Sequence, residues 1–140
     1  MASQAIPRGS ETILLVEPDP ETRKLAAFML SKQGYTVLEA RNAAEALQHY
    51  QERQRQVDLL LTEAWMSEVN GPQLARVLEA KDPRLCVVYL SDAANRHVTR
   101  RMETRAKRVL LERPFTMRLL ADKVRKALDS QAARIAAVGA

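Results

Sequence analysis

Short apolar runs alternate with longer segments of helical spacing along most of the chain. The runs are rich in Leu and Val and predict five strands, at residues 12–16, 35–39, 57–62, 86–91 and 108–112. The continuous apolar stretches 13–16 and 59–61 are typical of strands that are buried on both faces of a parallel sheet. Strands that alternate with helices in this way predict a doubly wound α/β domain.

The segments between the runs predict five helices, at 20–32, from 42 onward, from 71–72 up to 82–83, at 93–104 and from 116 to about 129. Asn42 followed by Glu45 matches a capping box. The apolar positions of these helices are Leu25, Phe28 and Met29 in the first, Ala43, Ala46, Leu47 and Tyr50 in the second, Leu74, Val77 and Leu78 in the third, and Leu119, Leu120, Val124 and Leu128 in the last. The Ala-rich end, 131–140, fits either a helical extension or a frayed tail.

The composition excludes several other classes of protein. Apolar residues make up 46% of the 140 residues and charged residues 28%, which excludes a disordered tail, a collagen and a disulfide scaffold. The single Cys86 lies in an apolar run, so we expect a buried hydrophobic side chain and a reducing, cytoplasmic environment. No apolar stretch is long enough for a membrane span, and residues 1–10 lack the core of a secretory signal. Two His and one Cys argue against a His/Cys metal site.

Ligands of doubly wound sheets bind beyond the carboxyl ends of the strands, so the residues at these ends are the candidates for function. The ends carry carboxylates, one hydroxyl and one cation, namely Glu17, Asp19, Glu63, Ser91, Asp92 and Arg113. No Gly-rich turn follows the first strand, which argues against a dinucleotide site. A carboxylate-rich cleft of this kind suits a hard metal ion and a phosphoryl group instead.

The four markers ILLVEPDP, VDLLLTEAWMSEVNG, VVYLS and LLERPF fall at four predicted strand ends. In their order and spacing the chain resembles the receiver domain of two-component response regulators, and especially receivers of hybrid sensor kinases. The resemblance covers 11–129, leaving a tail at 1–10 and an Ala-rich extension at 130–140. It implies a flavodoxin-like sheet of order 2-1-3-4-5, and phosphoryl transfer from a histidine kinase to an Asp on the third strand, with Mg²⁺ held by nearby acids.

The chain departs from the receiver pattern at the positions that carry this chemistry, while Glu17 and Ser91 are retained. The pattern-breaking residues are Glu63 for the acceptor Asp, Pro18 for a metal-binding acid, Arg113 for the Lys, Ser67 for a loop Pro and Leu110 for the switch aromatic. One unaltered carboxylate holds Mg²⁺ poorly, so we expect weak Mg²⁺ binding or none, and no enzyme activity. The resemblance therefore implies a degenerate receiver in which Glu63 imitates a phosphorylated acceptor.

Each substituted residue also has a simpler interpretation. Glu63 could be a solvated acid at a strand end, and Arg113 an exposed side chain at a loop start. Asp19 fits an N-cap, with Pro20 in the first helical position, better than a substitute metal ligand. Because the carboxylate at 63 and the cation at 113 are both long, we expect a direct Glu63–Arg113 ion pair with Ser91 near the carboxylate. The resemblance also implies a cis Arg113–Pro114 bond.

The net charge of +5 is concentrated in residues 96–126, where basic residues far outnumber acidic ones. Arg100, Arg101 and Arg105 are the candidate partner face, and a solvated surface is the simpler interpretation. The resemblance implies a protein partner, such as a histidine kinase or an output domain, or a second copy bound through the fourth helix, fifth strand and fifth helix. A working phosphoacceptor is one alternative. A nucleic-acid-binding module is another, although Phe115 is the only stacking candidate in the basic stretch.

Overall fold

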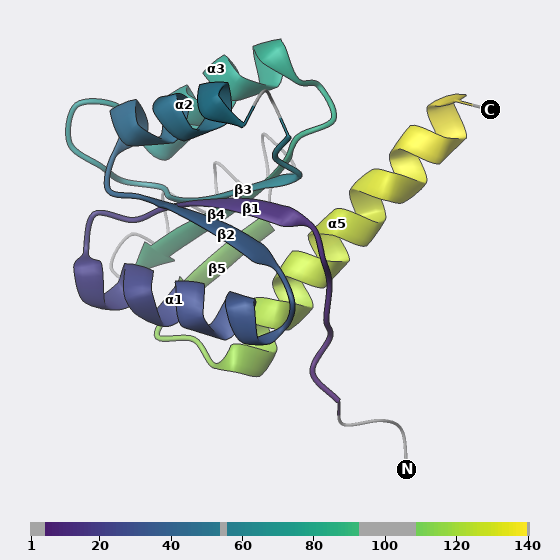
Figure 1. The fold of residues 1–140 in the computed structure, drawn as a ribbon, viewed down its shortest axis with the longest axis horizontal. Helices are drawn as coiled ribbons and strands as arrows, with labels where there is room; N and C mark the ends of the chain where they lie inside the picture. The colour runs from purple at the N-terminus through teal and green to yellow at the C-terminus, as the bar shows by residue number, and fades with distance from the viewer. Residues whose placement is uncertain (1–4, 54–55, 93–108, 140) are drawn as a thin grey trace.

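The computed structural model describes residues 5–53, 56–92 and 109–139. It contains one five-stranded parallel sheet of order β2-β1-β3-β4-β5, which confirms the predicted fold class and strand order (Figure 1). The strands are β1 (Thr12–Val16), β2 (Thr36–Ala40), β3 (Leu59–Glu63), β4 (Cys86–Asp92) and β5 (Val109–Arg113). Four strands, β2 to β5, end one residue later than predicted, because the ladder pairs Val16 with Ala40, Glu63 with Leu90 and Asp92 with Arg113.

Helices cover both faces of the sheet, as expected for a doubly wound domain (Figure 1). Helices α1 (Pro20–Lys32) and α5 (Met117–Gly139) pack on one face, and α2 (Ala43–Glu52) and α3 (Gly71–Lys81) pack on the other. Each face has its own hydrophobic core, and the central strands β1 and β3 contribute to both cores. Cys86 is buried as predicted, and burial raises the pKa of its thiol to about 11.

The predicted capping box at α2 forms only in part. The Asn42 side chain accepts from the Glu45 backbone N–H at 2.9 Å, but the Glu45 carboxylate accepts from the N–H of Arg41. The Arg41 side chain also donates to that carboxylate, so Glu45 binds Arg41 and does not complete the box. The complete capping box lies at α3, where Asn70 and Gln73 bond each other's backbone N–H groups.

On three helices, some of the apolar positions identified in the sequence are exposed. On α1, Leu25 and Phe28 are 51% and 56% exposed, and the helix buries Ala26, Ala27 and Leu30 instead. Both sets lie on one face of a helix, and the buried set continues the i, i+3, i+4, i+7 series that starts at the buried Arg23. Val77 of α3 and Leu119 of α5 are likewise exposed, while the small neighbours Ala75 and Ala121 are buried.

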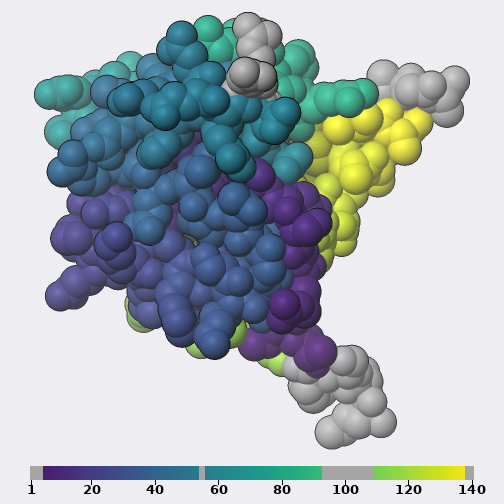
Figure 2. Space-filling model, viewed as in Figure 1, coloured from purple at the N-terminus to yellow at the C-terminus, as the bar shows by residue number. Residues whose placement is uncertain are grey.

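Helix α5 continues ten residues beyond its predicted end at Asp129 and reaches Gly139. The Ala-rich segment is therefore a helical extension, in agreement with the high helix propensity of Ala. Its C-terminal part stands out from the body of the domain (Figures 1 and 2). Within the described residues, no helix is both long enough and apolar enough to cross a membrane.

Part of the predicted N-terminal tail packs on the domain. The Gly9 N–H donates to the Gln33 carbonyl at 3.0 Å, and the Arg8 guanidinium donates to the Lys32 carbonyl at 3.2 Å. Arg125 of α5 binds the Glu11 carboxylate at 2.6 Å, which ties this segment to the last helix. The predicted helix 93–104 and the candidate partner residues Arg100, Arg101 and Arg105 lie outside the described residues.

Candidate functional site

The carboxyl ends of four strands meet around one guanidinium group. Arg113, at the end of β5, donates through Nη1 to Oε1 of Glu17 at 2.9 Å and to Oε2 of Glu63. Its Nε and Nη2 lie 2.8 and 2.7 Å from Oδ1 of Asp92, the last residue of β4. We call these four residues the Arg113 cluster. The predicted Glu63–Arg113 ion pair is confirmed, and the Arg113–Pro114 bond is cis as predicted.

The cluster lies mostly inside the protein. Glu17 and Glu63 are only 3% and 5% exposed, and the Arg113 side chain is 20% exposed. Asp92 forms the outer edge of the cluster, with 54% of its side chain exposed. Buried carboxylates are unfavourable without a counter-charge, so Arg113 neutralises charge that water cannot reach.

Each buried carboxylate also accepts one backbone hydrogen bond from the residue two positions later. Oε2 of Glu17 accepts from the N–H of Asp19 at 3.0 Å, and Oε1 of Glu63 accepts from the N–H of Trp65 at 3.2 Å. One oxygen of each carboxylate therefore faces Arg113 and the other faces its own loop. Both acids are held from two sides, which fixes their direction.

The pKa values of Glu17 and Arg113 are both raised, but for different reasons. Burial, together with the nearby charge of Glu63, raises the pKa of Glu17 to about 7, although the Asp19 N–H and Arg113 oppose this shift. Burial would lower the pKa of Arg113, but the hydrogen bond and charge of Glu63, with Asp92 and Glu17, raise it above its ordinary value. Arg113 therefore stays charged, while Glu17 titrates near neutral pH.

Two further candidates lie outside the cluster. Asp19 is the N-cap of α1, as predicted, and accepts from the Thr22 N–H at 2.9 Å and the Thr22 hydroxyl at 2.7 Å. These bonds to Thr22 hold the pKa of Asp19 below its usual value. The placement of Ser91 near the Glu63 carboxylate stays a prediction, and the Ser91 hydroxyl donates to the Asp92 carbonyl at 3.4 Å.

The other pattern-breaking residues differ in exposure. Pro18 and Ser67 are exposed in the loops after β1 and β3, and Leu110 is buried in β5. Trp65 is 38% exposed at the start of the β3–α3 loop. That loop also holds Glu68, a non-glycine residue with a φ of 68°, in the left-handed region.

The donor set does not fit Mg²⁺. This ion prefers octahedral coordination by several oxygens. Here Glu17 and Glu63 each direct an oxygen to the same Nη1 atom of Arg113, so a guanidinium N–H stands between the two carboxylates. Pro18 supplies no carboxylate, and Asp19 caps α1. Within the described parts of the chain, no group of three or more His, Cys, Asp or Glu side chains is arranged to hold a metal ion.

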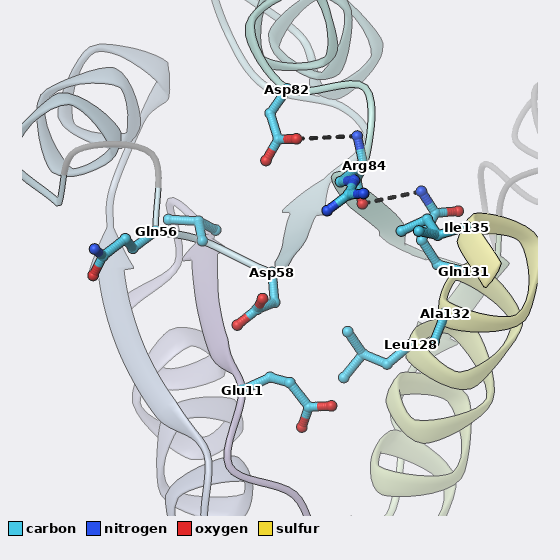
Figure 3. Close-up of a pocket in the computed structure, with 10 residues that line it drawn as sticks. Glu11, Gln56, Asp58, Asp82, Arg84, Leu128, Gln131, Ala132 and Ile135 are labelled. Carbon is cyan, nitrogen blue, oxygen red and sulfur yellow. Dashed lines mark hydrogen bonds between the residues drawn. The ribbon is translucent and has the colours of Figure 1, made fainter. Parts of the chain in front are cut away.

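Two cavities border opposite ends of the sheet. One of about 420 Å³ borders the cluster and is lined by Thr22, Leu25, Asp92, Arg113, Pro114 and Phe115. The other, of about 300 Å³, lies at the amino ends of β1, β3 and β4, against the extension of α5 (Figure 3). Its carboxylates are partnered, since Glu11 pairs with Arg125, Asp58 accepts from the Thr12 N–H and Asp82 accepts from the Arg84 N–H. The cluster is therefore the stronger candidate site.

Comparison with known proteins adds independent information. A family model described as response regulator receiver domain matches residues 13–125. The sensor kinase CckA of Brucella abortus is 34% identical over 123 residues, which cover 88% of this chain but 13% of CckA. The response regulator receiver protein CpdR of the same organism is 32% identical over 116 residues, which cover 83% of this chain and 95% of CpdR.

Solved structures show the same arrangement of elements. The crystal structure of NtrX from Brucella abortus superposes with a TM-score of 0.84 at 23% identity, covering 94% of this chain and 29% of NtrX. The receiver domain of the hybrid histidine kinase CckA superposes with a TM-score of 0.69 at 27% identity, covering 84% of this chain and 98% of that domain. The chain therefore spans a small part of some relatives and nearly the whole of others.

We predict that Arg113→Ala destabilises the protein by about 3 kcal/mol at pH 8, because it leaves two buried carboxylates without their cation. The loss should be smaller at pH 5, where a carboxyl group can take up a proton instead. Urea unfolding at the two pH values measures both effects. Arg76→Ala, on the exposed side of α3, serves as the control and should cost less than about 0.5 kcal/mol. An equal loss of stability in Arg113→Ala at both pH values would contradict the conclusion that Arg113 compensates the two buried carboxylates.

We predict a pH-dependent effect of Glu17→Gln. The Glu17 pKa is about 7 in the folded protein and 4.5 in its ordinary state, so the folded protein binds the extra proton between these values. The contribution of this group to stability is therefore present at low pH and is lost as the pH rises through 7. From pH 5 to pH 8, Glu17→Gln should gain about 2 kcal/mol of stability relative to the wild type. If urea unfolding gave the same pH dependence of stability for Glu17→Gln and the wild type, the raised pKa of Glu17 would be refuted.

Proposed function

The chain belongs to the response regulator receiver domain family, and on that premise we propose that it is a receiver module whose output does not depend on phosphorylation. As a receiver domain it is part of two-component signal transduction. In this proposal it is not an enzyme and acts by contact with another protein. Glu63 stands at the acceptor position and imitates a phosphorylated acceptor.

The observation that carries this proposal is the position of the Arg113 guanidinium between Glu17 and Glu63. In receivers of the usual pattern, the corresponding region takes a metal ion and a phosphoryl group between an Asp and a Lys. Here the longer Glu and the longer Arg meet directly, so the cation of the protein faces the acceptor carboxylate without a phosphoryl group. This direct contact supports a role that needs no phosphoryl transfer.

The permanent charge of Arg113 favours a single state of the module. Arg is protonated at any physiological pH, and the bond to Glu63 raises the pKa of Arg113 further. A receiver that is switched by a phosphoryl group must exchange between two arrangements of its site. The Arg113 cluster instead joins the ends of β1, β3, β4 and β5 through one side chain, which suits a module that is constitutively ready to bind.

Receiver domains interact with histidine kinases or phosphotransfer proteins, and we propose a protein of this kind, or an output domain, as the partner. The relative CckA is itself a sensor kinase. The alternative partner that we propose is a second copy of the chain, bound through the segment 93–104, β5 and α5. Two cations of the basic stretch, Arg113 and Arg125, are committed to internal ion pairs, which weakens the case for nucleic acid.

We predict that the protein takes up no phosphoryl group from acetyl phosphate in the presence of Mg²⁺, as measured by intact mass. Trp65 fluorescence should likewise not respond to Mg²⁺, because Arg113 stands between the two acids. The double variant Pro18→Asp with Glu63→Asp rebuilds the acidic cluster and should show a saturable fluorescence response, which establishes that Trp65 reports on the site.

One result of the phosphorylation experiment would contradict the proposed function. A phosphoryl adduct on wild-type Glu63, located by peptide mapping, would show a working phosphoacceptor and would overturn the proposed function. Arg113→Ala should restore neither the adduct nor the response to Mg²⁺, because Pro18 still supplies no carboxylate.

A further inference from the structure

Arg23 is a buried cation that lies outside the Arg113 cluster. It belongs to the face of α1 that packs on the sheet, and it is only 8% exposed. Charged side chains are almost never buried without partners, since losing hydration is costly. The atoms that Arg23 contacts therefore indicate what it does for the protein.

The contacts of Arg23 lie in the turn between β1 and α1. Its Nη1 donates to the backbone carbonyl of Glu17 at 2.8 Å and reaches the carbonyl of Pro18 at 3.4 Å. The paired ladder of β1 ends at Val16, so these two carbonyls lie beyond the strand. Arg23 supplies the donor that the sheet no longer offers them, which fixes the orientation of both peptide units.

We propose that Arg23 is the positioning residue of the Arg113 cluster, holding the turn from Glu17 to Asp19 so that the Glu17 carboxylate faces Arg113. The inference deepens the proposed function, on which it rests for the role of the cluster. Both oxygens of the carboxylate depend on this turn, since Oε1 lies 2.9 Å from Nη1 of Arg113 and Oε2 lies 3.0 Å from the Asp19 nitrogen. Rotation of the turn would displace both contacts together.

Arg23 has a second connection, to the edge of the sheet. Its Nε lies 3.5 Å from Oε1 of Glu39, on the edge strand β2. The Arg23 guanidinium thus links the Glu39 side chain of β2 to the turn that carries Glu17. A Lys ammonium at this position would keep the charge, but as a compact point charge it lacks the planar fork that bridges a carboxylate and carbonyls.

The neighbouring residue Lys24 provides a matched control. Its Nζ lies 3.4 Å from the same Glu39 oxygen, so both cations share one carboxylate. The Lys24 side chain is 70% exposed and makes no described contact with the turn carbonyls. Removing Lys24 therefore tests the ion pair with Glu39 alone, whereas removing Arg23 tests the ion pair and the turn together.

The test is amide hydrogen exchange measured by NMR, with the Asp19 N–H reporting on the turn and the Leu60 N–H of central β3 reporting on overall stability. In Arg23→Ala, exchange at Asp19 should accelerate about tenfold more than exchange at Leu60, because the Asp19–Glu17 hydrogen bond opens locally. Lys24→Ala should leave the ratio of the two rates unchanged. Arg23→Lys should raise the ratio of the Asp19 rate to the Leu60 rate about threefold. If Arg23→Ala does not fold, Arg23→Lys replaces it in the experiment.

Two outcomes would overturn the proposal. Equal acceleration at Asp19 and Leu60 in the Arg23 variants would reduce Arg23 to a general contributor to stability. The same change of ratio in Lys24→Ala would assign the effect to the ion pair with Glu39. A phosphoryl adduct on Glu63, detected by intact mass, would refute the proposed function, whereas the exchange rates are compared between unphosphorylated proteins, so the two failures are distinguishable.

Discussion

Two carboxylates sit almost fully buried at the ends of adjacent central strands, and one guanidinium compensates both of them. Glu17 and Glu63 repel each other, and burial disfavours their charged forms, as the raised pKa of Glu17 reflects. Arg113 offsets this cost through a single nitrogen that donates to both acids. The remaining features of the site follow from this arrangement: the direction of the loops after β1 and β3, the poor fit to Mg²⁺, and the outer contact with Asp92.

The sheet topology brings these groups together from distant parts of the sequence. Since the order is β2-β1-β3-β4-β5, four consecutive strands end side by side with Glu17, Glu63, Asp92 and Arg113. The cis bond after Arg113 and the cap at Asp19 lie in the loops that leave these strands. A fold that usually serves phosphoryl transfer therefore supports an internal ion cluster with few changes, which is consistent with a module that binds a partner in one fixed state.

Much of this arrangement could be predicted from the sequence, for identifiable reasons. Continuous apolar runs mark buried parallel strands, and the match of acid and base lengths at 63 and 113 indicated their contact. The pairing of Arg113 with Asp92 could not be derived in this way, because an Asp next to Ser91 has no distinctive pattern. The sequence pattern did not reveal the exposure of Leu25 and Phe28, because Ala26, Ala27 and Leu30 form a second apolar face of the same helix. The role of Arg23 depends on backbone carbonyls, which leave no signal in a sequence.

The central claim is that Arg113 takes the place of a metal ion between Glu17 and Glu63. The most direct measurement follows the ¹⁵N signals of the Arg113 side chain by NMR while Mg²⁺ is added to millimolar concentration. The account predicts that the chemical shifts of the Arg113 Nε and Nη signals do not change, because the guanidinium remains bound to both carboxylates. A saturable shift of these signals, with release of Arg113 from the two acids, would contradict it.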